Sequence, residues 1–277
     1  MLPRRGDRPG VNAPEIDDKR RWNGSHGFME LSRDSEPAVG PAAYAMEAEG
    51  ITKSYGHLRA LRGVSFQVPK GEFVTLFGKN GAGKTTFLKI AATLARPSGG
   101  RLRIHGVDIQ DEPERIRRQI GFLSHSTSVY RDLTPLENLR FFSRLYGVGH
   151  TDEHINALIE RIGLGRRKND PVRAFSRGLH QRVGLARVML HDPALLLLDE
   201  PYTGLDASAV EILNRMLDEV VAGGRTVILT THDLELGLRA STKIHIIDRG
   251  KIVYSAARSD PGVREAYARH IRVGATK

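Results

Sequence analysis

Short apolar runs, each bounded by glycine, proline or polar residues, recur along the chain from residue 46 onward. These runs are too short for helices, and their unbroken apolar character is typical of parallel strands that are buried on both faces. Ahead of them, Val64, Phe66 and Val68 alternate with polar neighbours, which predicts one half-buried strand. We predict the buried strands at residues 73–77, 120–123, 195–198 and 226–230.

Helical spacing replaces this pattern between residues 134 and 163. The segment Thr134-Pro-Leu-Glu137 predicts a capping box with proline at the first helical position. Two apolar stripes follow at helical spacing, and we interpret both as core-facing. They consist of Leu139, Phe142 and Leu145, and of Ile155, Leu158, Ile159 and Ile162. Later in the chain, residues 244–247 and 251–254 flank Asp248-Arg-Gly250, which predicts a hairpin.

The first 45 residues differ from the rest of the chain. Five prolines and five glycines interrupt them, and no apolar periodicity survives between these residues, so we expect a disordered tail. Met46 stands directly before the first strand-like pattern, which gives the hypothesis that translation begins there. We therefore expect a tail at 1–45, one α/β domain at 46–255 with a helical subdomain at about 126–190, and a C-terminal helical extension at 256–277.

Composition narrows the possible chemistry. The chain has 277 residues, 40% of them hydrophobic and 27% charged, as is typical of globular proteins. Cysteine is absent, which excludes disulfides, thiolate metal ligation and a cysteine nucleophile. No apolar run approaches the roughly 18 residues that a membrane span needs. The net charge is 42 − 32 = +10, which favours phosphates, nucleic acid or an anionic membrane, and is equally expected of an arginine-rich solvated surface.

A glycine-rich segment follows the strand predicted at 73–77. It reads Gly78-Lys-Asn-Gly-Ala-Gly83-Lys84-Thr85 and matches the P-loop pattern, with helix-forming residues after it. Its backbone N–H groups are expected to bind phosphates, Lys84 to neutralise the β and γ oxygens, and Thr85 to ligate magnesium. The alternative is a glycine-rich turn with an exposed lysine. The predicted ATP-binding residues here are Gly78, Lys79, Asn80, Gly81, Ala82, Gly83, Lys84, Thr85 and Thr86.

Polar side chains follow two other predicted strands. Asp199 and Glu200 come directly after residues 195–198, and His232 follows the strand at 226–230. Ligands bind at the carboxyl ends of strands in open α/β sheets. We expect Asp199 to hold Mg²⁺, and Glu200 to orient or deprotonate the attacking water, with His232 and Lys84 as further catalytic residues at the γ-phosphate. The alternatives are acidic residues that cap the next element and a structural histidine.

Residues 175–182 identify a family. They read Phe-Ser-Arg-Gly-Leu-His-Gln-Arg and resemble the L-S-G-G-Q signature of ABC transporter nucleotide-binding subunits. Ser176 and Gly178 match its serine and second glycine, whereas Phe175, Arg177 and Leu179 depart from it. The resemblance covers residues 46–255. It implies a P-loop NTPase (RecA-like) core with a mostly parallel sheet, an antiparallel β subdomain and a helical subdomain.

The resemblance also assigns roles to residues outside the signature. Tyr55 stands where the family has an aromatic residue that stacks on adenine, Gly204-Leu205-Asp206 resembles the D-loop, and His232 resembles the switch histidine. In this family ATP and Mg²⁺ bind between two cassettes, so the resemblance implies a homodimer in which Ser176, Gly178 and Asp206 complete the partner's site. It further implies an integral membrane partner and a peripheral position on the cytoplasmic face of the membrane. Nucleic acid is not an expected partner.

One position suggests a subfamily. His125 stands where the family has a glutamine that contacts magnesium, and imidazole is a poorer magnesium ligand than an amide oxygen. Its surroundings most resemble the ATPase subunit of the haem exporter of c-type cytochrome maturation. The alternatives are a drug, lipid or polysaccharide exporter and a soluble ABC ATPase such as an iron–sulfur assembly protein. An ordinary P-loop kinase gives no reason for residues 176–181 or for His232.

Overall fold

The computed structural model describes residues 43–124 and 126–272. Residues 1–42 of the expected tail lie outside the described residues, as do His125 and residues 273–277 of the expected C-terminal extension. Within the described residues, no helix is long enough and apolar enough to cross a membrane.

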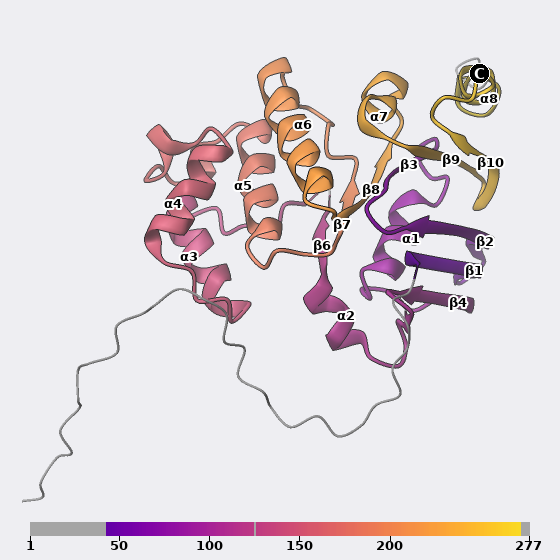
Figure 1. The fold of residues 1–277 in the computed structure, drawn as a ribbon, viewed down its shortest axis with the longest axis horizontal. Coiled ribbons are helices and arrows are strands. Elements are labelled where there is room, and N and C mark those ends of the chain that lie inside the picture. The colour runs from indigo at the N-terminus through magenta and orange to yellow at the C-terminus, as the bar shows by residue number, and fades with distance from the viewer. Residues whose placement is uncertain (1–42, 125, 273–277) are drawn as a thin grey trace, which may run out of the picture. The chain divides into compact units, whose positions relative to one another are not determined.

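The central sheet has six strands in the order β10-β9-β3-β8-β7-β6 (Figure 1). All neighbouring pairs are parallel except β9 with β10, which form the predicted hairpin. Every residue of β3, β7 and β8 is buried, which explains why these strands are continuous apolar runs. The bounds are β3 Phe73–Phe77, β6 Ile120–Leu123, β7 Leu195–Asp199, β8 Thr226–Thr231, β9 Lys243–Asp248 and β10 Lys251–Ala257.

A second, antiparallel sheet has the order β2-β1-β4-β5. Its strands are β1 Tyr44–Tyr55, β2 Leu58–Pro69, β4 Gly99–Ile104 and β5 Val107–Asp108. The alternation predicted around Val64 is confirmed on β2. The boundary at residue 45 is wrong: β1 begins at Tyr44, where it pairs with Pro69, and buried Ala45 accepts a hydrogen bond from the His105 backbone. These non-local contacts leave no local periodicity in the sequence.

Helices surround the central sheet and form the helical subdomain. The predicted capping box is confirmed at α3, where the Glu137 N–H donates to Thr134 Oγ1 (3.2 Å) and the Thr134 N–H donates to Glu137 Oε2 (2.8 Å). The expected C-terminal extension starts inside β10 and becomes helical only at Val263. The bounds are α1 Lys84–Ala91, α2 Pro113–Gln119, α3 Pro135–Leu145, α4 Asp152–Arg161, α5 Arg177–Met189, α6 Ala207–Ala222, α7 Leu234–Ala240 and α8 Val263–Tyr267, with short turns at Gly165–Arg167, Val172–Ala174 and Ala268–Arg272.

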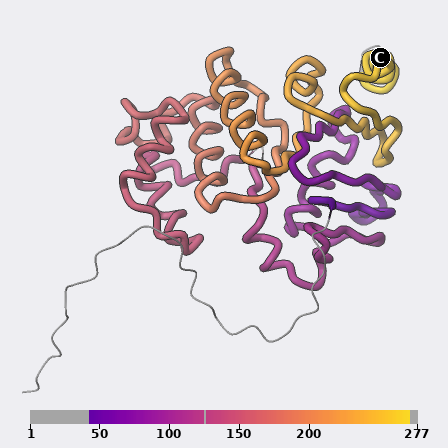
Figure 2. Tube along the Cα trace, in the orientation of Figure 1, coloured from indigo at the N-terminus to yellow at the C-terminus, as the bar shows by residue number. Residues whose placement is uncertain are grey.

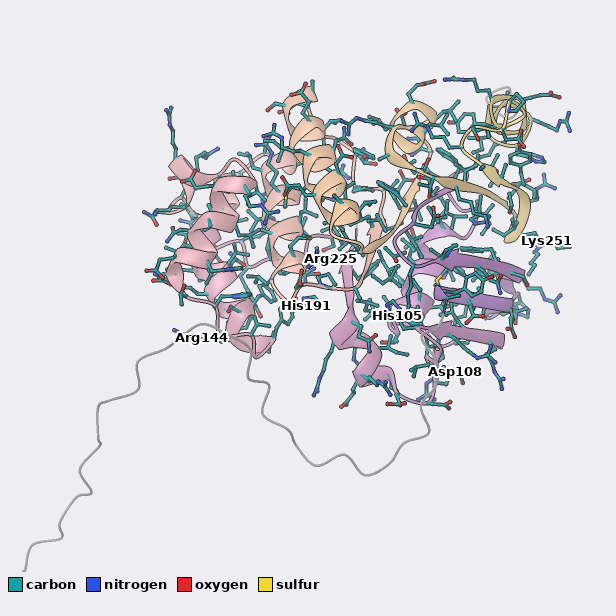
Figure 3. The ribbon with its side chains drawn as sticks, viewed as in Figure 1. His105, Asp108, Arg144, His191, Arg225 and Lys251 are labelled. Atoms are coloured by element: carbon teal, nitrogen blue, oxygen red, sulfur yellow. The ribbon has the colours of Figure 1, made fainter. Side chains whose placement is uncertain are left out.

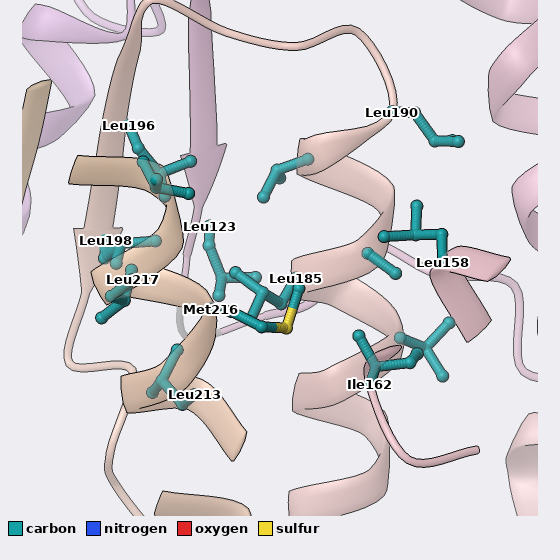
Figure 4. Packing of buried hydrophobic residues seen from close by; sticks show 14 of the residues in the cluster. Leu123, Leu158, Ile162, Leu185, Leu190, Leu196, Leu198, Leu213, Met216 and Leu217 are labelled. Carbon is teal, nitrogen blue, oxygen red and sulfur yellow. The ribbon is translucent and has the colours of Figure 1, made fainter. Parts of the chain in front are cut away.

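Apolar side chains pack in three clusters. The first joins the helical subdomain to the sheet, and Figure 4 shows Leu185 of α5 and Met216 of α6 near Leu123 of β6. The second lies between α1 and the two sheets. The third connects α8 with β3 and β9 beside the C-terminal end of the described chain (Figure 2). The first and third clusters therefore attach the helical subdomain and the C-terminal helix to the same sheet.

Candidate functional site

The P-loop connects β3 to α1 and approaches β2 closely. Gly83 is the N-cap of α1 with φ 112°, and a Cβ atom there would lie 2.8 Å from the carbonyl oxygen of Ala60. A side chain is therefore excluded by both conformation and space. Lys84 is 5% exposed, and its Nζ donates to the carbonyl oxygens of Gly78 (2.6 Å) and Lys79 (3.2 Å). The ammonium group is thus held against the loop whose N–H groups begin the helix.

Two hydroxyl groups meet one carboxylate oxygen at the end of β7. Thr85 Oγ1 donates to Asp199 Oδ1 (3.1 Å), and Thr230 Oγ1 donates to the same oxygen (2.8 Å). Oxygen donors of this kind are the ligands that Mg²⁺ prefers. The donor set therefore fits magnesium, and Thr85 and Asp199 are the residues that would hold it.

Glu200 occupies a strained position between two other site residues. Its φ is 51°, a conformation that costs a non-glycine residue about 1–3 kcal/mol, and its N–H is fixed by the Thr230 carbonyl oxygen and Oγ1, both at 3.1 Å. Oε1 lies 3.0 Å from Lys84 Nζ, and Oε2 lies 2.9 Å from Nδ1 of His232. The Glu200 side chain is 14% exposed and that of His232 is 54% exposed. The three predicted catalytic residues thus form one connected group.

A pocket of about 440 Å³ opens above this group. It contains most of the predicted phosphate-binding residues together with Tyr55, which is 49% exposed and has Lys53 Nζ 4.9 Å from its ring centroid. Gly78 and Ala82 do not line it, because they lie beneath the loop surface. The lining residues are Tyr55, Leu58, Arg59, Ala60, Arg62, Lys79, Asn80, Gly81, Gly83, Lys84, Thr85, Thr86, Glu200 and Arg249.

Sequence reasoning missed four residues of this site. Arg59, Arg62 and Arg249 line the pocket, and Thr230 fixes both carboxylates. Arg249 lies in the turn between β9 and β10, whose Gly250 N–H donates to the Ala82 carbonyl oxygen (2.9 Å). The two basic residues after Tyr55 were the available signal for the first pair. The turn gave no signal because its contact with the P-loop is non-local.

The signature and the D-loop lie beside each other, away from this pocket. Ser176 caps α5 by accepting from the Leu179 N–H (3.4 Å), and Asp206 caps α6 by accepting from the Ala209 N–H (2.7 Å). A Cβ atom on Gly178 would lie 3.6 Å from the Leu205 side chain. None of the three predicted residues here lines the pocket that contains Lys84. A single chain therefore brings the P-loop group together but not the signature group.

The departure at Phe175 is accommodated by the core. Its ring is buried in the first apolar cluster, and the Arg167 guanidinium lies 4.6 Å from its centroid. Next to it, a hollow of about 440 Å³ is lined by residues 126–129 and by Phe175, Arg177 and His180. The segment after His125 thus adjoins the start of α5. His125 itself lies outside the described residues.

A further hollow, of about 410 Å³, lies at the opposite ends of the strands. His105 and Arg225, labelled in Figure 3, line it together with Lys70. Burial, followed by the charge of Lys70, lowers the pKa of His105. Residues that line this hollow precede β6, β7 and β8, whereas ligands of open α/β sheets bind at the carboxyl ends of the strands. The pocket above Lys84 is therefore the candidate active site.

Comparisons with known proteins agree with this location. The family model described as "ABC transporter" matches residues 61–203. The ABC transporter ATP-binding protein NatA of Bacillus subtilis (strain 168) is 35% identical over 203 residues, which are 72% of this chain and 82% of the relative. The daunorubicin resistance ATP-binding protein DrrA2 of Streptomyces coeruleorubidus is 38% identical over 212 residues, which are 76% of this chain and 66% of the relative.

A solved structure extends the similarity to three dimensions. The dimeric post-hydrolysis state of the ATP-binding cassette MJ0796, bound to ADP and Pi, superposes with a TM-score of 0.72 at 27% identity and covers 78% of this chain and 99% of that one. The family match and the identity to NatA lie on the same residues as the P-loop and the signature. The chain belongs to the ABC transporter family and carries its ATP-binding, ATP-hydrolysing domain.

Proposed function

We propose that this chain is the ATPase subunit of an ABC exporter, and that it works as a pair of identical subunits on the cytoplasmic face of the membrane. The observation that carries the proposal is the connected group Lys84, Glu200 and His232 at the floor of the pocket. A buried cation, a carboxylate and an imidazole at the carboxyl ends of parallel strands are the groups that phosphoryl transfer to water requires.

The pocket residues divide the binding of ATP among them. Tyr55 stacks on the base, a contact worth about 1–3 kcal/mol by analogy with nucleic-acid bases. The N–H groups at the start of α1 and the Lys84 ammonium hold the phosphates. Thr85 and Asp199 hold Mg²⁺, which when bound neutralises charge on the phosphate oxygens. Arg59, Arg62 and Arg249 add positive charge around the same pocket.

Glu200 acts as the base or the water-orienting residue. Its Oε1 faces Lys84, so a phosphate that attracts the Lys84 ammonium leaves this oxygen for the attacking water. His232 donates from Nδ1 to Oε2, because an ionised carboxylate oxygen only accepts. This hydrogen bond fixes the tautomer of His232 and leaves Nε2 as its other polar atom. His232 thereby keeps the Glu200 carboxylate oriented while Lys84 moves.

Two copies are needed to complete each site. Ser176, Gly178 and Asp206 belong to one surface of the chain and do not line its own pocket. We propose that they contact the nucleotide bound by a second copy, so that two ATP molecules join two chains and hydrolysis separates them. The dimeric MJ0796 cassette supports this arrangement. Closure and release are the two states that drive transport.

The cargo is proposed on different grounds. The relative from S. coeruleorubidus is a daunorubicin resistance protein, which supports export of a drug-like molecule. Haem export rests on the sequence around His125 alone, and export of a lipid or polysaccharide and a soluble ABC ATPase are less favoured because no contact in the structure supports them. The membrane subunit would contact the segment after His125, where exposed Tyr130 packs edge-on against exposed Phe141 at a centroid distance of 5.0 Å.

Replacement of Lys84 by alanine is expected to weaken ATP binding by about 10- to 100-fold, because it removes charge-assisted hydrogen bonds to the phosphates. Titration calorimetry with ATP and Mg²⁺ measures the change. Lys89→Ala is the matched control, since Lys89 is exposed on the same helix and does not line the pocket. Unchanged affinity in Lys84→Ala would contradict the proposed phosphate site.

Replacement of Glu200 by glutamine is expected to preserve ATP binding and to reduce turnover by about 10²- to 10⁴-fold, the range for loss of a general base. Steady-state phosphate release and nucleotide titration measure the two effects separately. The control is Glu211→Gln, which neutralises an exposed carboxylate on α6. Wild-type turnover in Glu200→Gln would rule out this role for Glu200.

The pairing of subunits is tested in the Glu200→Gln background, where ATP persists. With ATP and Mg²⁺ this variant is expected to dimerise in analytical ultracentrifugation, and added Ser176→Ala is expected to weaken the dimer at least about tenfold through lost contacts with the partner's nucleotide. Since Ser176 also caps α5, the control is Thr151→Ala, which removes a cap of equal length (3.4 Å) from α4. A monomer in the Glu200→Gln variant, or an equally stable dimer after Ser176→Ala, would contradict the proposal.

The membrane contact is tested by co-expression with the proposed membrane subunit and purification in detergent. Phe141→Ala is expected to reduce co-purification severalfold at unchanged basal ATPase activity, because it removes exposed apolar area beside Tyr130. Leu94→Ala, at a similarly exposed leucine outside the helical subdomain, is the control. Purification of the wild-type chain without any membrane protein would favour the soluble ABC ATPase instead.

A further inference from the structure

The C-terminal helix α8 packs against the segment that carries His232. Its residues Val263, Ala266 and Tyr267 are buried, and they form the third apolar cluster with Phe77 of β3 and with β9. Phe77 is the last residue of β3 and directly precedes the P-loop. The last described helix therefore reaches the two strand ends from which Gly78 and His232 continue.

Tyr267 connects these two strand ends. Its hydroxyl donates a hydrogen bond to the backbone carbonyl oxygen of His232. Its ring meets that of Phe77 edge-on, with centroids 5.6 Å apart and an interplanar angle of 86°. The phenol is 6% exposed, so the hydrogen bond is largely shielded from water. Shielding strengthens a hydrogen bond and makes its loss more costly.

The elements on either side of His232 are fixed by other contacts. The Asp233 side chain caps α7, and the N–H of Asp233 donates to Thr231 Oγ1 (3.0 Å). The carbonyl oxygen of Gly237 in α7 accepts from Thr75 Oγ1 of β3 (2.8 Å). Arg264 of α8 forms two hydrogen bonds, of 2.6 and 3.2 Å, with Glu235 in the first turn of α7. Helices α7 and α8 thus hold the backbone on which the His232 side chain is mounted.

The His232 side chain itself is little restrained by packing. It is 54% exposed, and it reaches Glu200 through the single 2.9 Å contact of Nδ1. The direction of such a side chain depends on the orientation of its own peptide group. The Tyr267 hydroxyl fixes that peptide group through its carbonyl oxygen.

We propose that Tyr267 is a positioning residue for ATP hydrolysis, which acts through the His232 backbone to keep the imidazole on Glu200. This inference rests on the proposed role of His232. The C-terminal helix is then part of the apparatus that sets the turnover rate, although Tyr267 touches no residue of the nucleotide pocket lining.

The test is Tyr267→Phe in the full chain, which keeps the ring against Phe77 and removes the hydroxyl. The expected result is a three- to tenfold lower kcat with the Kd for ATP unchanged, because the hydrogen bond orients a catalytic group and binds no substrate. Tyr254→Phe is the matched control: Tyr254 packs against the same cluster, but its hydroxyl bonds to Asp260. This control is expected to keep wild-type kcat. Equal loss in both variants, or wild-type kcat in Tyr267→Phe, overturns the inference.

A double variant separates positioning from a general structural effect. His232→Ala is expected to lower kcat strongly, and Tyr267→Phe is expected to cause no further loss in that background. A further three- to tenfold loss would show that Tyr267 acts elsewhere and would overturn the inference while the role of His232 stands. Wild-type kcat in His232→Ala would instead overturn the proposed role of His232. Thermal unfolding of each variant verifies that all are folded at the assay temperature.

Discussion

The parallel register of β3, β7 and β8 is the constraint on which the site depends. Phe77 pairs with Thr231, and Asp199 pairs with Thr230, so three strands end at one edge of the sheet. Thr85 and Asp199 are 114 residues apart in sequence and their side chains lie 3.1 Å apart in space. Because all three strands are buried on both faces, a register shift would move polar strand-end residues into the core. Core packing therefore fixes the geometry of the carboxylates.

Features that depend on neighbouring residues were predictable from the sequence. The apolar runs gave the buried strands because burial on both faces requires an uninterrupted apolar segment. The capping box at Thr134 was predictable because both of its hydrogen bonds lie within four residues. Lys84 and Thr85 followed from the P-loop spacing, whose meaning is local to one strand, one loop and one helix.

Features that depend on distant contacts were not predictable in this way. Thr230 is an ordinary strand residue in the sequence, and only its position between β7 and β3 makes it the partner of Asp199 and Glu200. The same reason applies to Arg249, which reaches the pocket because its hairpin supports the P-loop. Phe175 departs from the signature in the sequence, whereas the structure places its ring in the core. Volume and burial explain that position better than identity does.

The pairing of Lys84 with Glu200 links nucleotide binding to catalysis. Both groups are largely buried, and a buried charge that loses its partner is strongly destabilised. Lys84 can leave Glu200 only when another anion takes the place of the carboxylate, and the phosphates of ATP carry that charge in the same pocket. Glu200 then keeps the contact with His232, which prevents the carboxylate from being left without any partner. A base that is engaged by a cation until phosphate arrives is protected from reacting without its substrate, and this protection needs no movement larger than that of one lysine side chain.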